Sequence, residues 1–268
     1  MRILVTNDDG IDSVGLQILA RAMREHGEVV VIAPDQEFSG ASAAIGAINL
    51  LDPIAERRTI DGIDEAWALN LAPAMCSIVG RSGVFGEVDL VVSGINPGAN
   101  IGRALYHSGT VGAALTARLG GISGVAVSQA VSGWGVSGQS WDEFVADLRW
   151  DDAAHIASEV VGALITDLPT DPVVVNINVP DVDFDEIKGW RYAEIGAVPP
   201  VDFGPFHLVP IDGAPDRQRI KMSFGQEQSL PNETDTGTIE NNEVAVTMIS
   251  RFSHVAAEEL DTVSSALD

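Results

Sequence analysis

Apolar stretches of strand length alternate with amphipathic stretches over the first 180 residues. Residues 2–6 (RILVT) and 28–33 (EVVVIA) are almost continuously apolar, which is typical of strands buried on both faces of a parallel sheet. Between them, apolar residues recur at helical spacing from Leu16 to Met23, behind a possible cap at Asp12 or Ser13 and ahead of Gly27. This first unit therefore predicts strand, helix, strand.

The same alternation continues along the chain. Further strands are expected at residues 64–69, 88–92, 124–128 and 172–179, and weakly alternating extended structure at residues 43–60. Helices are expected at residues 73–79, 111–119 and 151–168, and Ser140 to Glu143 has the capping-box form that opens another. Strands alternating with helices predict right-handed βαβ units and an α/β fold with a parallel sheet.

The pattern changes after Asp181. Residues 196–215 are rich in proline and glycine and predict an appendage of hairpins, followed by a strand at 243–249 and a terminal helix at 254–267. We therefore divide the chain into a core, residues 1–180, and a hairpin arm with a C-terminal oligomerisation segment, residues 181–268. This second part has few regular apolar segments, so we expect another subunit to order it.

Composition narrows the class of protein. Of 268 residues 46% are hydrophobic, enough for a core, and the apolar runs are too short to span a membrane. Met1-Arg2 leads directly into the first strand and Cys76 is the single cysteine, so we expect a cytoplasmic protein without disulfides. The net charge of −24 disfavours nucleic-acid polymers and anionic membranes as partners.

Two adjacent carboxylates, Asp8 and Asp9, follow the first strand directly. Asn-Asp-Asp-Gly is also good turn chemistry, so on its own this stretch is equally well read as a turn. Like charges side by side repel, however, and a bound cation offsets that cost. In an open parallel sheet, the carboxyl ends of the strands are where ligands bind.

Two more oxygen-bearing side chains follow neighbouring predicted strands: Ser39 after residues 28–33 and Asn96 after residues 88–92. Parallel strands share a direction, so all four side chains are expected at one edge of the sheet. Carboxylate, hydroxyl and amide oxygens suit Mg²⁺ or Mn²⁺, and no histidine or cysteine pair stands nearby at zinc spacing.

A candidate phosphate site lies at Ser108-Gly109-Thr110, where a helix begins. Backbone N–H groups and the helix dipole attract anions there, and Gly109 permits close approach. Taken alone, an ordinary serine or threonine cap is the more common reading, and Asn96 and Asn100 suit a turn. Beside a metal, the same residues describe the apparatus of metal-assisted phosphate hydrolysis.

The chain resembles the SurE family of survival-protein nucleotidases in four segments: TNDDGIDSVGL, APDQEFSG, DLVVSGINPGANIG and HSGTVGAA. The match runs in order through most of the first 180 residues, with NINVPD as a further piece. The resemblance implies a metal-dependent phosphatase of nucleoside monophosphates, with a Rossmann-like three-layer core, a hairpin arm and homodimers or homotetramers. It places one Mg²⁺ or Mn²⁺ per subunit on Asp8, Asp9, Ser39 and Asn96.

On this reading Asp8, Asp9 and Asn96 are the catalytic residues. The phosphate-binding residues are Gly40, Asn100, Ser108, Gly109 and Thr110. The chain departs from the family pattern at Ala104, which replaces an acid, at His107, which replaces a tyrosine, and in residues 70–76 and 242–249. The metal ligands are unchanged, so these departures bear on base preference and assembly.

Two alternatives stay open at this point. Asp8 could be the nucleophile of a covalent aspartyl-phosphate mechanism, although the second acid usual two residues later is here Gly10. The chain could instead be a metal-dependent nucleotide-binding subunit with little turnover, which the loss of an acid at Ala104 would suit. Turnover of 5′-AMP with Mn²⁺ separates this alternative from the hydrolase, and borohydride trapping separates the covalent mechanism.

Overall fold

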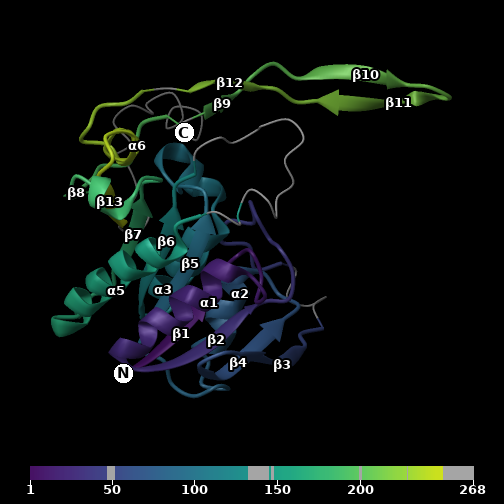
Figure 1. Cartoon of the computed structure of the whole chain (residues 1–268). Helices are drawn as coiled ribbons and strands as arrows, with labels where there is room; N and C mark the ends of the chain where they lie inside the picture. The colour runs from purple at the N-terminus through teal and green to yellow at the C-terminus, as the bar shows by residue number, and fades with distance from the viewer. Residues whose placement is uncertain (47–51, 132–144, 146–147, 199–200, 228, 250–268) are drawn as a thin grey trace, which may run out of the picture.

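The computed structural model describes residues 1–46, 52–131, 145, 148–198, 201–227 and 229–249. Its centre is a nine-stranded sheet with the order β3-β4-β2-β1-β5-β6-β7-β13-β8 (Figure 1). The parallel strands that form its middle are β1 (Arg2–Thr6), β2 (Glu28–Pro34), β4 (Ile63–Leu69), β5 (Leu90–Pro97), β6 (Ser123–Gln129) and β7 (Val174–Val179). The predicted parallel α/β sheet is therefore confirmed.

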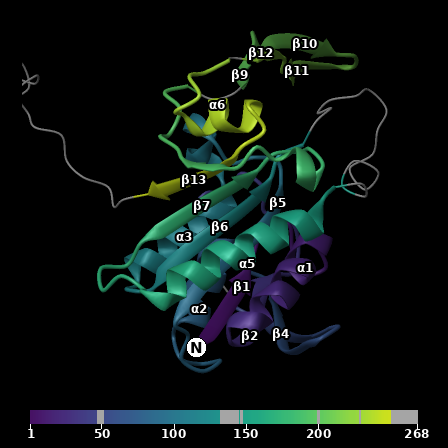
Figure 2. The same ribbon diagram turned by 60° about the vertical axis from the view of Figure 1, so that its left-hand side comes forward.

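Helices cover both faces of the sheet because its central strands are apolar on both faces. Ile3 and Val5 of β1 pack into the layer that contains α1 (Val14–Met23) and α5 (Trp150–Thr166). Leu4, between them, points into the opposite layer with α2 (Pro73–Gly80), and α3 (Gly109–Leu119) contributes Ala117 there. The three layers are visible in Figure 2.

Local signals set the helix boundaries as the sequence predicts. Ser13 caps α1 by accepting a hydrogen bond from the amide of Leu16 at 3.4 Å, and a short 3₁₀ helix, η1 (Arg24–His26), leads into Gly27. Cys76 is buried in α2 and is a core residue, as its apolar surroundings predict. The capping box at residues 140–143 and the terminal helix at 254–267 lie outside the described residues.

One boundary differs from the prediction in a way that matters for the site. The stretch after Val92, expected to be a loop, continues as strand β5 to Pro97. Its pairing with β6 shifts in register between Ser93 and Asn96. Gly94 has φ +139°, and a Cβ there would lie 2.4 Å from the carbonyl oxygen of Val127. Glycine thus allows β5 to remain paired with β6 through the irregularity. As a result, Asn96 lies in the sheet, opposite Ser128 of β6.

The last third of the chain contributes both to the sheet and to an arm. Strand β13 (Val244–Ile249) pairs antiparallel with β7 and parallel with the edge strand β8 (Trp190–Tyr192), beyond η4 (Phe184–Glu186). The predicted hairpins are present as β9 (Val201–Phe203) with β12 (Phe224–Glu227) and β10 (His207–Ile211) with β11 (Ala214–Lys221). They extend away from the body as a ribbon (Figure 1).

Two of the elements that were not predicted in these forms lie at either end of the sheet region. A short helix, α6 (Asp235–Glu240), follows the arm, and β3 (Ala55–Ile60) folds back antiparallel on β4 to form the other sheet edge. None of the helices in the described part of the chain combines the length and hydropathy that crossing a membrane requires.

Candidate active site

The candidate site lies where three adjacent parallel strands end. β1 stands between β2 and β5, with Ile3 paired to Val29 on one side and to Leu90 on the other. Asp8 and Asp9 follow β1, Ser39 lies in the loop after β2, and Asn96 lies near the end of β5. The strand order therefore brings all four to the same edge of the sheet, as the sequence predicts.

The side chain of Asp8 is buried against the start of α3. Its Oδ1 accepts a hydrogen bond of 2.5 Å from the hydroxyl of Thr110, and the backbone N–H groups of Gly109 and Thr110 face the carboxylate. Burial raises the pKa of Asp8 above its usual value, and these donors oppose the increase. A Cβ on Gly109 would lie 2.7 Å from Asp8 Oδ2, so only glycine permits this approach.

Asp9 has an unpaired oxygen. Its Oδ2 is buried without a hydrogen-bond partner although the side chain as a whole is partly exposed. Burial, and then the negative charges of Asp8 and Glu37, raise the pKa of Asp9 to about 8. A carboxylate oxygen left without a donor beside a second carboxylate is what a divalent cation would satisfy.

The loop after β2 is fastened to the carboxylate pair. The amide of Phe38 donates to the backbone carbonyl of Asp8 at 2.7 Å, and Gly10, with φ +97°, lies against the backbone of Gln36. Ser39 is exposed, and its hydroxyl donates to Glu37 Oε1 at 2.8 Å, which leaves its oxygen free to act as a ligand. Ser39 therefore follows directly after Phe38, the residue whose amide is bonded to Asp8.

Gly40 offers backbone to the site, whereas Asn96 offers a side-chain oxygen. Gly40 has φ +78°, and a Cβ there would meet no atom within 4 Å, so the backbone borders open space. Asn96 donates through Nδ2 to the carbonyl of Gly98 at 2.7 Å. Because that bond uses its amide nitrogen, the side-chain carbonyl oxygen of Asn96 remains the group available to a cation.

The structure gives the predicted phosphate-binding side chains specific partners within the protein. Ser108 caps α3 by accepting from the amide of Val111 at 3.1 Å, which is the ordinary capping role considered from the sequence. The Thr110 hydroxyl is engaged by Asp8. The first N–H groups of α3 are also bonded, to Asp8 and to Ser108, so a phosphate here would meet the open loop at Gly40.

Asn100 belongs to a buried polar network that the sequence reading missed. Its amide nitrogen donates to Ser128 Oγ at 2.9 Å, and its backbone N–H donates to Asn178 Oδ1 at 2.7 Å. The backbone carbonyl oxygen of Asn100 accepts from the side-chain amides of Asn176 and Asn178, at 2.9 and 3.2 Å. The signal was available in residues 174–179, where two asparagines stand two apart in an apolar strand and so point to one face.

Glu37 was also missed. It accepts from Ser39 and contributes to the raised pKa of Asp9. No group of three or more His, Cys, Asp and Glu suited to a metal occurs in the described part of the chain. The candidate metal site accordingly depends on two carboxylates completed by a hydroxyl and an amide oxygen.

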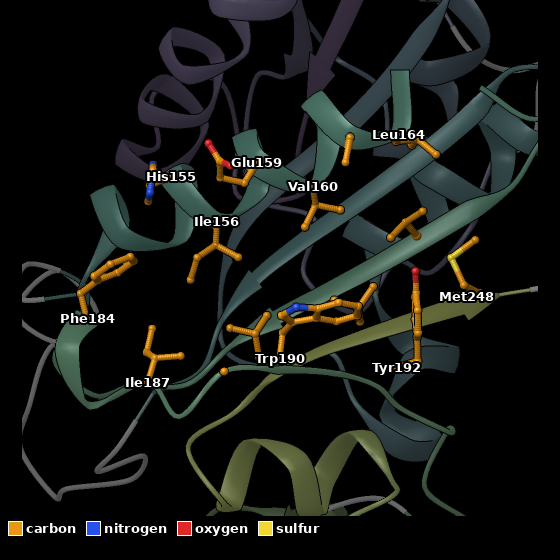
Figure 3. A pocket seen from close by; sticks show the side chains of 15 residues that line it. His155, Ile156, Glu159, Val160, Leu164, Phe184, Ile187, Trp190, Tyr192 and Met248 are labelled. Carbon is orange, nitrogen blue, oxygen red and sulfur yellow. The ribbon is translucent and has the colours of Figure 1, made fainter. Parts of the chain in front are cut away.

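A groove of about 680 Å³ lies elsewhere, between α5 and the strands β8 and β13 (Figure 3). Trp190, Tyr192 and Met248 face Ile156 and Val160 across it. None of the predicted site residues lines this groove, and its walls are mainly apolar. It therefore offers little to a phosphate, and the chemistry points to the carboxyl edge of β1, β2 and β5.

Comparisons with known proteins agree with this geometry. The family model described as survival protein SurE matches residues 3–199. The chain is 37% identical over 197 residues to "5′-nucleotidase SurE" of Mannheimia succiniciproducens, covering 73% of this chain and 72% of the relative. It is 39% identical over 199 residues to the protein of the same name from Xanthomonas oryzae pv. oryzae, covering 73% and 70%. The crystal structure of the SurE protein from Aquifex aeolicus shares the fold over the full length of both chains, with a TM-score of 0.78 and 24% identity.

Proposed function

The chain belongs to the SurE family, and from that premise we propose that it is a 5′-nucleotidase, an enzyme that hydrolyses nucleoside 5′-monophosphates to nucleoside and phosphate. The curated relatives that cover more than two thirds of its length carry that name. The observation that carries the proposal is the unpaired, buried Oδ2 of Asp9 beside the carboxylate of Asp8.

The residues present fit a divalent cation. An unsatisfied carboxylate oxygen, a second carboxylate, a hydroxyl oxygen and a free amide oxygen form a hard-oxygen donor set. We assign one Mg²⁺ or Mn²⁺ per subunit to Asp8, Asp9, Ser39 and Asn96. When bound, this cation supplies Lewis-acid polarisation of a phosphoryl oxygen.

The chain's own residues perform the remaining tasks. Thr110 holds the Asp8 carboxylate in one orientation, and Gly109 keeps the start of α3 against it. Asp9 and Asn96 orient the attacking water for in-line displacement at phosphorus. The open backbone at Gly40 receives the phosphoryl oxygens as negative charge develops on them.

The covalent alternative fits the geometry less well. The acid two residues later that this mechanism uses is replaced by Gly10, which packs on Gln36. Borohydride should accordingly trap no acyl-phosphate on Asp8 during turnover.

Three finer assignments belong to the same proposal. The oxygen-only donors favour Mg²⁺ or Mn²⁺ over Zn²⁺. The exposed apolar residues of the arm favour a homodimer or homotetramer, and the chain's composition favours the cytoplasm. Hydrolysis of nucleoside 3′-monophosphates is a separate question, which the 3′-AMP assay below decides.

The test is phosphate release from 5′-AMP and 3′-AMP with Mg²⁺, Mn²⁺ or EDTA. Activity should disappear with EDTA and return with either metal. Asp9→Asn should lose turnover and Mn²⁺ binding while remaining folded. Asp12→Asn is the matched control, because Asp12 is an exposed acid on the same loop, and it should keep wild-type activity. An active Asp9→Asn protein in EDTA would refute the assignment.

A further inference from the structure

Asp235 is a fully buried carboxylate outside the site. It is the first residue of α6, directly after Thr234, whose side chain caps that helix. Its Oδ2 accepts from the backbone N–H of Gly102 at 2.8 Å. Its Oδ1 accepts from the backbone N–H groups of Gly196 at 3.0 Å and Thr236 at 2.8 Å. Burying a carboxylate is costly, and here neutral backbone donors offset the cost.

Two of these amides, those of Gly196 and Gly102, come from distant parts of the chain. Gly196 precedes the arm and Asp235 follows it, so the bond between them joins the two roots of the arm. Gly102 lies 133 residues from Asp235 in sequence and begins η3 (Gly102–His107), the segment that leads into Ser108 and α3. The carboxylate therefore connects the arm's base to the site segment, which we define as residues 96–110.

Gly102 is held closely at this junction. Its φ is +53°, and a Cβ there would lie 2.4 Å from the carbonyl oxygen of Val198. The amide of Arg103 points to the same carbonyl at 3.5 Å. On one side of Gly102 lie Asn96 and Asn100, and on the other lie Ser108 to Thr110. Asp235 and Val198 thus fix the middle of a segment whose two ends form the site.

We propose that Asp235 is a positioning residue for the hydrolytic site: by holding the Gly102 amide, it sets the spacing between Asn96 and the start of α3. The inference depends on the proposed function of residues 96–110. A carboxylate is required because both of its oxygens accept. The amide nitrogen of an asparagine would face an N–H group and repel it.

The experiment compares Asp235→Asn with Thr234→Ala. Thr234 is the neighbouring residue and caps α6 by accepting from the Gly237 amide, but the structure gives it no bond to Gly102. Both variants should destabilise the protein. Only Asp235→Asn should speed hydrogen exchange at the Gly102 and Gly196 amides, weaken Mn²⁺ binding, and lower kcat at saturating Mn²⁺ by about tenfold or more, with little change in KM.

A second variant keeps the proposal testable if Asp235→Asn does not fold. Gly102→Ala strains the same junction from the other side, because its Cβ meets Val198, and it should give the same exchange, Mn²⁺ and kcat pattern. Either folded variant with wild-type Mn²⁺ affinity and kcat would overturn the proposal. So would a Thr234→Ala protein showing the same losses. A wild-type enzyme without turnover refutes the proposed function instead, and Mn²⁺ affinity and exchange then decide the role of Asp235.

Discussion

At the scale of single residues, the carboxylate pair at the end of β1 lowers the stability of the folded protein and forms part of the proposed site. Asp8 is buried, Asp9 has an unpaired oxygen, and the negative charge of Asp8 raises the cost of ionising Asp9. Thr110 and Gly109 reduce this cost for Asp8 but leave Asp9 uncompensated within the protein. Stability and function therefore oppose each other at Asp9.

Asp9→Asn should stabilise the metal-free protein. The folded pKa of Asp9 is about 8 and the ordinary value is 3.8, so between these values the folded state retains a proton that the unfolded state has lost. The free energy of unfolding should therefore fall as pH rises from about 4 to 8. In EDTA at pH 8 the variant should melt at least about 2 °C higher, the shift that about 1 kcal/mol gives in a chain of this size.

Thermal melts of wild type and variant at pH 5 and pH 8 measure this effect. The difference between the two proteins should be larger at pH 8. An Asp9→Asn protein that melts below wild type in EDTA at pH 8 would contradict the account of the carboxylate pair.

Thr110→Val should lower kcat/KM roughly ten- to a hundredfold, because a hydrogen bond to a charged group contributes about 1.5–3 kcal/mol. Valine keeps the volume of threonine but loses the donor to Asp8. Thr110→Ser keeps the donor and should retain most of the activity. Steady-state kinetics at saturating Mn²⁺ measure both. Equal activity in wild type and the valine variant would show that Asp8 needs no such support.

The meeting of Asp8, Asp9, Ser39 and Asn96 at one sheet edge could be predicted from the sequence because each follows a predicted parallel strand. Their hydrogen-bond partners could not be predicted. The hydroxyl of Thr110 donates to Asp8, and Asn100 lies in a network with Asn176 and Asn178. Such pairings depend on strand order and register, which place residues 70 or more positions apart in contact.

At the scale of elements, periodicity predicted most strands and helices, and the misses have local causes. The prediction ended β5 at Val92 because residues 93–98 have a composition typical of turns. In the structure, a shifted register against β6 keeps the strand paired as far as Pro97. The helix α6 was missed because six residues are too few to show a 3.6-residue period. Its start is instead marked by Thr234, a cap that only the structure made evident.

The arm carries apolar side chains that its own hairpin does not bury. Leu208 and Ile220 are paired across β10 and β11 and are 66% and 60% exposed. We expect a second copy of the chain to cover them. Leu208→Ser combined with Ile220→Ser should shift the protein toward monomer in sedimentation equilibrium without lowering the melting temperature of the core. Arg219→Gln, next to Ile220 in β11, is the control. A wild-type monomer would contradict the expectation.

At the scale of the whole molecule, charge acts against the proposed substrate. The net charge is −24, and the sequence has only two lysines, Lys188 and Lys221. Carboxylates near the site repel an anionic nucleotide over about 10 Å at 0.1 M salt. Moderate salt should therefore raise kcat/KM for 5′-AMP until ions compete for the pocket. A steady fall in kcat/KM from the lowest salt upward would instead indicate a basic surface that attracts the substrate.

The alternation of elements was enough to predict a parallel α/β sheet, but the position of the last strand was not predictable. β13 lies between β7 and β8, although the segment of chain from residue 193 to residue 243 separates it from β8. A pattern of apolar residues shows that a strand is buried, but it does not show which two strands lie next to it.

That insertion has a consequence during protein synthesis. As the ribosome makes the chain, β1 to β7 can pair in the order in which they emerge or close to it, whereas β8 stands next to β13 alone at the sheet edge. Until residues 244–249 have left the exit tunnel, β7 presents an open edge, and Trp190 and Tyr192 have no neighbouring strand. A nascent chain stalled before Val244 should therefore be a substrate for cellular chaperones, and release of the last strand should end that dependence.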